Sequence, residues 1–214
     1  MQRAYGLEIP QTLEEVCDPR RMALLVYDMQ VGIVRHIPDA EAFTARVVRV
    51  VEAARSAGMR VVFARHLSLP NELAGVFQLR TAMVWQRVER VEDVRPLFLR
   101  DAPDFQLVPA LTPRPSEAVF DKLAMSMFVG TPLELVLRDC GINSFAIVGA
   151  VTEIGIEPTV RHGSDLGFIP VVVADACGSV DPAAGQRSLA SLDYALMSLQ
   201  TDVETFTGLL GPSG

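Results

Sequence analysis

The sequence is poor in the residues on which small secreted proteins and metal sites depend. Its 214 residues include three cysteines, Cys17, Cys140 and Cys177, and none of them stands in a CxxC or Cys/His ligand spacing. An odd and sparse set of cysteines is typical of free thiols in a reducing compartment. The three histidines are scattered, without an HxxxH or DxH pair. We therefore expect a cytoplasmic protein with no metal ion or other cofactor.

Long apolar runs are also absent. The uncharged run at 140–152 is shorter than the about 20 residues that an apolar helix needs to cross a bilayer. The first residues begin no apolar core of the kind that a signal peptide has. We expect no membrane partner.

Positive charge is scarce. Lys and Arg number 19 and Asp and Glu number 26, which gives a formal net charge of −7 at pH 7. This balance argues against a nucleic-acid partner, because nothing offsets the repulsion by phosphates, whereas a small anionic substrate responds only to the local charge of its pocket. Half of the residues are apolar and 21% are charged, values that exclude a disordered chain. The length predicts one domain over residues 1–214.

Five short, apolar and β-branched runs predict strands that are buried on both faces of a parallel sheet. They cover residues 22–27, 60–64, 118–120, 145–148 and 170–174, and a last strand is predicted at 202–205. Helical patterns at 39–57, 131–139, 153–166 and 183–199 alternate with them. This alternation predicts a three-layer α/β/α sandwich with a mostly parallel, Rossmann-like sheet of about six strands. The irregular segment 67–115, with six of the 14 prolines, is predicted to be a lid or insertion beside the sheet.

The residues that follow the strands carry the candidate chemistry, because open parallel sheets bind ligands outside the carboxyl ends of their strands. Asp28 follows the first run, and Lys122, the only lysine of the chain, follows the third. Burial of Asp28 would favour its protonated form and a neighbouring cation its charged form, so this residue is a candidate general acid or base. Position alone leaves two alternatives open, namely a loop cap or structural ion pair at Asp28 and a solvated amine at Lys122.

Two glycines, Gly149 and Gly155, bracket a turn that leads from a strand into a helix. The N–H groups at a helix N-terminus can hold an anion or an oxyanion, although a plain connecting turn explains the glycines equally well. The sequence contains no GxGxxG, GxxxxGK[ST] or GxSxG motif. It therefore does not predict a dinucleotide site, a phosphate-binding P-loop or a serine nucleophile elbow.

Three ordered motifs resemble those of the isochorismatase-like hydrolases, also called the cysteine hydrolase superfamily. They are LLVYDMQ at 24–30, FDK followed by SMF at 120–128, and GAVTEIGIE at 149–157. The resemblance implies a catalytic Asp, Lys and Cys at the ends of the first, third and fourth strands. It also implies a non-proline cis peptide near Ala150–Val151, which would aim backbone N–H groups into the pocket, and a homodimer or homotetramer.

Asp28 and Lys122 match this pattern, but Gly155 stands where most members carry the nucleophilic Cys. Glycine has no side chain, so thiolate attack is impossible at this position. Cys140 and Cys177 lie outside the motif and are interpreted as core thiols. Amidases of this family, such as the nicotinamidases, need the Cys. True isochorismatases resemble this chain because they keep the Asp and the Lys without a Cys nucleophile. They hydrolyse a vinyl ether and release pyruvate, and their Asp is thought to protonate the vinyl carbon before water attacks.

The match to isochorismatases is incomplete, since those proteins usually carry an aromatic residue and a His where this chain has Val151, Thr152 and Glu153. Glu153 would add a negative charge, which basic residues of the lid region could offset. We predict eight substrate-binding residues: Gln30, Arg65, Gln78, Trp85, Arg87, Phe128, Val151 and Thr152.

The predicted function is hydrolysis of a small acidic or cyclic molecule at a vinyl ether or a related C–O or C–N bond, by Asp28 and Lys122 and without a cysteine. The alternative is a degenerate family member that binds a small molecule or a partner without turnover. Loss of the nucleophile at Gly155 favours the alternative. Retention of a buried Asp–Lys pair, which is costly to desolvate, favours the enzyme.

Overall fold

The computed structural model describes residues 1–211 and is built around one six-stranded sheet. Its strands lie in the order β5-β4-β3-β6-β7-β8, and every neighbouring pair is parallel. The strands are β3 (Met22–Tyr27), β4 (Arg60–His66), β5 (Ala118–Lys122), β6 (Ser144–Ala150), β7 (Ile169–Gly178) and β8 (Leu199–Thr201). All six residues of β3 are buried, which explains why this central strand reads as a continuous apolar run.

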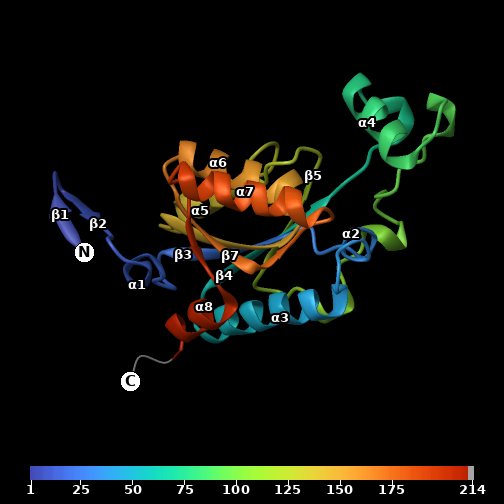
Figure 1. Ribbon diagram of the computed structural model, residues 1–214. Helices are drawn as coiled ribbons and strands as arrows, with labels where there is room; N and C mark the ends of the chain where they lie inside the picture. The colour runs from blue at the N-terminus through green and yellow to red at the C-terminus, as the bar shows by residue number, and fades with distance from the viewer. Residues whose placement is uncertain (212–214) are drawn as a thin grey trace.

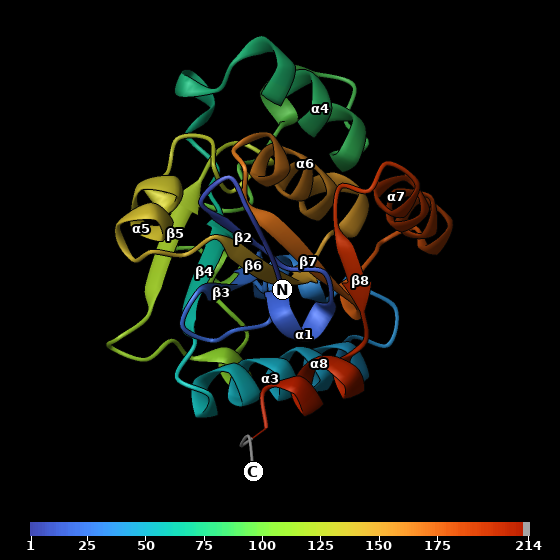
Figure 2. The ribbon, with the colours of Figure 1, turned by 90° about the vertical axis from the view of Figure 1, so that its left-hand side faces the viewer.

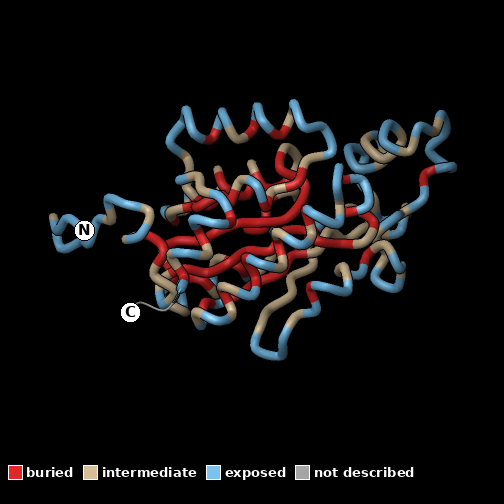
Figure 3. The backbone as a smooth tube through the Cα atoms, turned by 60° about the horizontal axis from the view of Figure 1, so that its bottom comes forward, coloured by how far each residue is buried: buried red, intermediate tan, exposed pale blue. Residues whose placement is uncertain are grey.

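Helices cover both faces of the sheet, as Figures 1 and 2 show. One face packs against α3 (Ala40–Ser56) and α8 (Val203–Leu209). The opposite face is covered by α5 (Leu133–Asp139), α6 (Glu157–Asp165) and α7 (Pro182–Tyr194). Two apolar clusters of buried side chains result, one on each side of the sheet, and Figure 3 shows the buried strands between the exposed outer surfaces of the helices. The predicted three-layer α/β/α sandwich is confirmed.

The prediction for the C-terminal region is wrong in one element. The residues predicted as a last strand at 202–205 begin α8, because Asp202 caps this helix by accepting a hydrogen bond from the N–H of Thr205. The sixth strand is instead β8, which lies just before it and begins at Leu199, the residue at which the predicted helix 183–199 was expected to end. Two helix starts also differ from the prediction, since α5 begins at Leu133 and the predicted helix at 153–166 opens with the π-helical turn η5 (Thr152–Ile156) before α6.

Smaller elements surround the sandwich. An N-terminal hairpin of β1 (Gln2–Ala4) and β2 (Leu7–Ile9) precedes α1 (Leu13–Val16), and α2 (Val31–Val34) follows β3. The segment predicted as a lid or insertion contains η1 (Asn71–Leu73), α4 (Val76–Gln86), η2 (Val91–Asp93), η3 (Pro103–Phe105) and η4 (Pro109–Leu111). Helix α4 has no buried residue and stands outside the three layers, at the end of the molecule away from the hairpin (Figure 1). Within residues 1–211, no helix is both long and apolar enough to cross a membrane.

Candidate functional site

Asp28 and Lys122 meet at the carboxyl end of the sheet. Asp28 follows β3 and Lys122 ends β5, and β4 lies between these two strands. The ammonium Nζ of Lys122 lies 2.8 Å from Oδ2 of Asp28. The residues are only 4% and 2% exposed, respectively. The sheet topology therefore brings the two predicted catalytic residues together as a buried ion pair.

The surroundings of the pair set its electrostatics. Burial lowers the pKa of the Lys122 amine from its ordinary value, and the charge of Asp28 partly offsets this effect. The ammonium also lies 4.2 Å from the centre of the Tyr27 ring, a cation–π contact. Asp28 adopts a left-handed backbone conformation with φ of 43°, which turns the chain sharply at the end of β3. Its second carboxylate oxygen, Oδ1, is buried and has no hydrogen-bond partner among residues 1–211.

Tyr27 fills the space that a side chain at position 155 would need. A Cβ atom built on Gly155 would overlap three atoms of the phenol, Oη, Cζ and Cε1. The ring is fixed in this place, because Oη donates a hydrogen bond to the carbonyl of Met125 and the residue is 2% exposed. Burial and the neighbouring Asp28 carboxylate raise the pKa of Tyr27 well above its usual value, so the phenol keeps its proton. With Tyr27 in this place, only glycine fits at position 155.

The turn after β6 fits tightly against β3. Gly149 has φ of 120°, and a Cβ atom there would lie 2.8 Å from the backbone nitrogen of Tyr27, so this position requires glycine. The Ala150–Val151 peptide bond is cis, as expected from the resemblance. Thr152 is buried and its hydroxyl donates to the carbonyl of Gly178. Glu153 accepts hydrogen bonds from the N–H groups of two residues at 180–181, so its Oε1 serves a structural role instead of facing a substrate.

The structure places most of the predicted substrate-binding side chains in structural contacts. The amide of Gln30 is fully used, because it donates to the carbonyls of His66 and Phe105 and accepts from the N–H of His66. Arg65 forms a salt bridge of 2.8 Å with Asp121 and lies over the Phe105 ring.

Three further predicted residues lie in the aromatic core, in an apolar cluster and at the end of α4. Phe128 belongs to a buried aromatic cluster with Phe145 and Phe168. Val151 is 8% exposed within the apolar cluster on the α3 side of the sheet, and Arg87 caps the C-terminus of α4.

Gln78 and Trp85 are the two predicted substrate-binding residues that line a cavity. This cavity has a volume of about 290 Å³ and lies between α4 and the ends of β4 and β5. His66, which was not predicted as a site residue, also lines it. Its position at the end of β4, beside Asp28 and Lys122 at the neighbouring strand ends, was a signal that could have found it. Tyr27 had no such signal, since the sequence presents it only as the last residue of an apolar strand.

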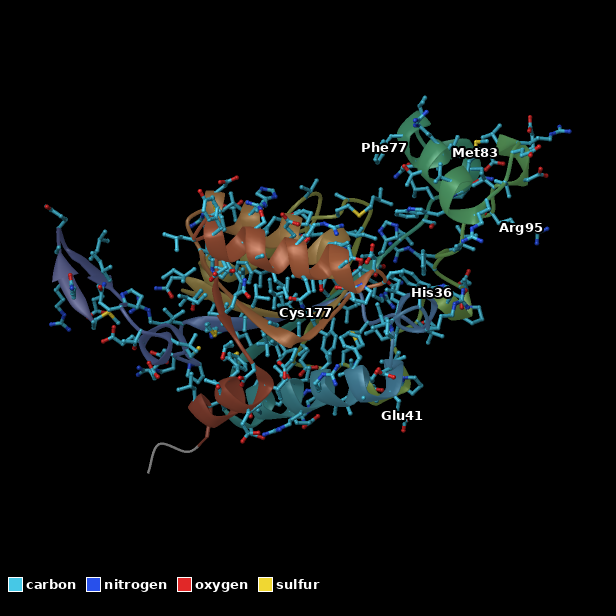
Figure 4. The ribbon with its side chains drawn as sticks, in the orientation of Figure 1. His36, Glu41, Phe77, Met83, Arg95 and Cys177 are labelled. Carbon is cyan, nitrogen blue, oxygen red and sulfur yellow. The ribbon has the colours of Figure 1, made fainter. Side chains whose placement is uncertain are left out.

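The cysteines do not supply a thiolate at this site. Burial raises the pKa of Cys17 to about 12 and also raises the pKa of Cys177. Figure 4 shows Cys177 within the central sheet, where its thiol lies 3.7 Å from the carbonyl oxygen of Ile147. The three cysteines are free of disulfides. In the described part of the chain, no group of three His, Cys, Asp or Glu side chains is arranged to hold a metal ion.

The doubly covered parallel sheet defines an α/β protein, and an acid and an amine meet at its strand ends, where open parallel sheets bind ligands. The model of the isochorismatase domain matches residues 22–204, so the chain belongs to the isochorismatase family of hydrolases. Solved structures share this fold. A cysteine hydrolase from Pseudomonas syringae pv. phaseolicola is 24% identical with a TM-score of 0.75, and the match covers 90% of this chain and 93% of that one.

Two further solved structures show the same architecture. An isochorismatase family protein from Desulfovibrio vulgaris is 20% identical with a TM-score of 0.76, over 89% of this chain and 98% of that one. An N-carbamoylsarcosine amidase from Thermoplasma acidophilum is 21% identical with a TM-score of 0.69, over 86% of this chain and 97% of that one. At these identities the likeness concerns the fold.

Proposed function

We propose that the protein hydrolyses a small molecule at a vinyl ether or a related C–O or C–N bond, with Asp28 as the acid–base group and no cysteine nucleophile. The observation that supports this most directly is the asymmetric Asp28 carboxylate. Lys122 holds Oδ2 at 2.8 Å, whereas the buried Oδ1 has no partner within residues 1–211. A buried, unpaired carboxylate oxygen is costly, so its retention is expected where a substrate or a catalytic water completes its hydrogen bonding.

A buried ion pair of this kind contributes little to the stability of the fold. Buried salt bridges often contribute nothing relative to apolar residues of the same shape, because desolvation offsets the attraction between the charges. The chain nevertheless places its single lysine there, 2% exposed, against Asp28. Chemistry therefore explains the pair better than folding does.

A vinyl ether illustrates the proton transfers. The acid form of Asp28 donates its Oδ1 proton to the vinyl carbon, and the ammonium of Lys122 stabilises the carboxylate that this step creates. Water then adds to the cationic carbon and returns one proton to Asp28. The resulting hemiketal separates into an alcohol and a ketone. Position 155 takes no part, and Tyr27, which keeps its proton, is not a nucleophile.

The alternative is a binding protein without turnover. The absence of a side chain at Gly155 favours it, since no thiolate can attack a substrate from this position. Thermal-shift screening of small amides and enol ethers separates the two functions, because a pure binder gives ligand-dependent stabilisation without any product.

The direct test is pyruvate release from isochorismate, followed by a panel of enol ethers and amides for product formation. Asp28→Asn should abolish turnover of whichever compound reacts. Asp121→Asn is the matched control, because Asp121 precedes Lys122 in β5 but pairs with Arg65 and Arg100. Full activity of the Asp28→Asn protein would refute the acid–base role.

A further inference from the structure

The cavity beside α4 lies next to the acid–amine pair. Its walls are residues 66–69, α4, the segment 94–98 and residues 123–125, whereas Asp28 and Lys122 do not line it. Two of its lining residues touch the buried site. His66 is the register partner of Lys122 between β4 and β5, and the carbonyl of Met125 accepts the hydrogen bond from Tyr27. A molecule in the cavity therefore lies against His66 and Met125, which adjoin the pair.

Most polar side chains of the cavity wall are already engaged within the protein. Gln78 accepts a hydrogen bond from the N–H of Gly75, and Asn71 donates to the carbonyl of Val94. Gln86 bonds both the N–H and the carbonyl of Arg95. These groups hold the lid segment together, and they offer a ligand few free donors or acceptors.

The other side chains that line the cavity are apolar and partly exposed to solvent. Phe77, Trp85, Leu97 and Leu123 line the cavity and are 73%, 61%, 43% and 41% exposed, respectively. Figure 4 shows Phe77 on the side of α4 that faces the body of the molecule. An apolar cavity of about 150 Å³ holds one benzene ring, so about 290 Å³ has room for roughly two rings or an equivalent aliphatic group.

Charge is nearly absent from this lining. Among the described residues that form it, none is Asp, Glu or Lys, and Arg95 is exposed to solvent. The imidazole of His66 lies edge-on against Phe98, and its nitrogens form no hydrogen bond with residues 1–211. Burial lowers the pKa of His66, which keeps the ring neutral at neutral pH.

We propose that this cavity binds the uncharged, apolar part of the substrate, an aryl or branched aliphatic group, and that His66 orients the polar group of the same molecule toward Asp28. The claim that the bound molecule is a substrate rests on the proposed function. The claim about charge and polarity rests on the cavity alone. Carboxylates of the same shape should bind more weakly, because an anion is costly to bury against the apolar walls and Arg95, the cationic side chain of the lining, is exposed to solvent.

The chain contains a built-in reporter for this site. Trp85 is the only tryptophan, lines the cavity and is 61% exposed. Titration with para-tert-butylbenzamide should shift the Trp85 emission to shorter wavelength as the ligand covers the indole. The matched anion, para-tert-butylbenzoate, should bind at least about tenfold more weakly at neutral pH.

Two substitutions test the location. Ala82→Leu adds volume inside the cavity and should weaken amide binding about tenfold, whereas Ala190→Leu makes the same change on the exposed surface of α7 and should have no effect. His66→Phe keeps the ring shape. It should weaken binding of the amide but leave binding of para-tert-butyltoluene unchanged.

The outcomes separate this inference from the proposed function. Amide binding by the wild type that persists in Asp28→Ala, together with no turnover of any tested compound by the wild type, supports the cavity and contradicts the hydrolase. Turnover of charged and neutral substrates at equal rates supports the hydrolase and overturns the cavity assignment. Equal affinity for amide and carboxylate, or a Trp85 spectrum that responds to protein dilution but not to ligand, also overturns it. The latter result would show that a second copy of the chain covers this face.

Discussion

The steric relation between Tyr27 and Gly155 makes a sharp prediction, because each residue determines what the other can be. Gly155→Ala adds one methyl group that would overlap three atoms of the phenol, well inside the 3.0 Å that real Cβ atoms keep. The ring cannot move freely, since it is 2% exposed, lies under the Lys122 ammonium and donates to Met125. Tyr27→Val removes all three overlapping atoms.

The magnitudes follow from packing. Overpacking of a closed core costs about 1–3 kcal/mol, and a displacement of the ring by about 1 Å belongs at the upper end, so we expect Gly155→Ala to lower the free energy of unfolding by about 3 kcal/mol. In the Tyr27→Val protein the added methyl meets no ring. There it should be neutral or stabilising by about 0.5–1 kcal/mol, the usual benefit of replacing glycine where the backbone permits it. The coupling energy is then about 3–4 kcal/mol.

Urea unfolding of the wild type, both single variants and the double variant measures this coupling. Tyr27→Val alone should cost about 3 kcal/mol as a large-to-small core substitution, which a domain of ordinary stability tolerates. Gly163→Ala is a useful comparison, because its added methyl would meet the ring of Phe145 and should be equally costly with and without Tyr27. The reasoning fails if Gly155→Ala is equally destabilising in both backgrounds.

Four further outcomes are expected. The single lysine gives one signal in a protein labelled at the lysine side-chain carbons, and NMR titration should place the pKa of Lys122 below its ordinary value of 10.5, lower still in Asp28→Asn; a pKa at or above 10.5 would contradict the effect of burial. Lys122→Met alone should lower the free energy of unfolding in urea by about 3–5 kcal/mol, because it leaves the Asp28 charge buried without a partner. The double variant with Asp28→Asn should recover most of this stability but remain inactive; a double variant as unstable as Lys122→Met would show that the pair is needed for stability. Because His66 binds its proton more weakly in the folded protein, stability should fall as the pH drops below about 6.5, and a His66→Phe variant with the same pH profile would argue against this. Val76 and Val84 of α4, 87% and 70% exposed, should be covered in a homodimer or homotetramer, so light scattering should find an oligomer that Val84→Glu weakens; a monomeric wild type would refute this.

The central sheet could be predicted from the sequence because its strands are buried on both faces. Residues 22–27 form an uninterrupted apolar run, and β3 has the same bounds. Asp28 and Lys122 could also be predicted from the sequence for this reason. A charged residue at or directly after the end of a buried apolar run is conspicuous, and parallel strands place their carboxyl ends at one ligand-binding edge. The other strands extended beyond the prediction by one to four residues at one or both ends, and the added residues of β4 are partly exposed.

Helix α4 could not be predicted because its residues have no apolar periodicity, and none of them is buried. The last strand was misplaced because the residues after Asp202 include β-branched side chains that favour a strand, whereas the Asp202 cap starts a helix. Arg65 and Arg87 do not line the cavity. Their charge suggested a substrate anion, but charge in a sequence does not reveal an internal partner such as the Asp121 that pairs with Arg65.

The pairing of Tyr27 with Gly155 explains how the site differs from a thiol enzyme on the same fold. A cysteine at position 155 would have no room beside the phenol, so no single substitution there restores a nucleophile. Conversely, removing the phenol alone would leave a void and an uncovered Lys122. A substitution at only one of the two positions is therefore destabilising. The Asp28–Lys122 pair lies beside them, in a site where a thiol at position 155 is sterically excluded. This arrangement supports the proposed reaction, in which Asp28 moves the proton and water attacks.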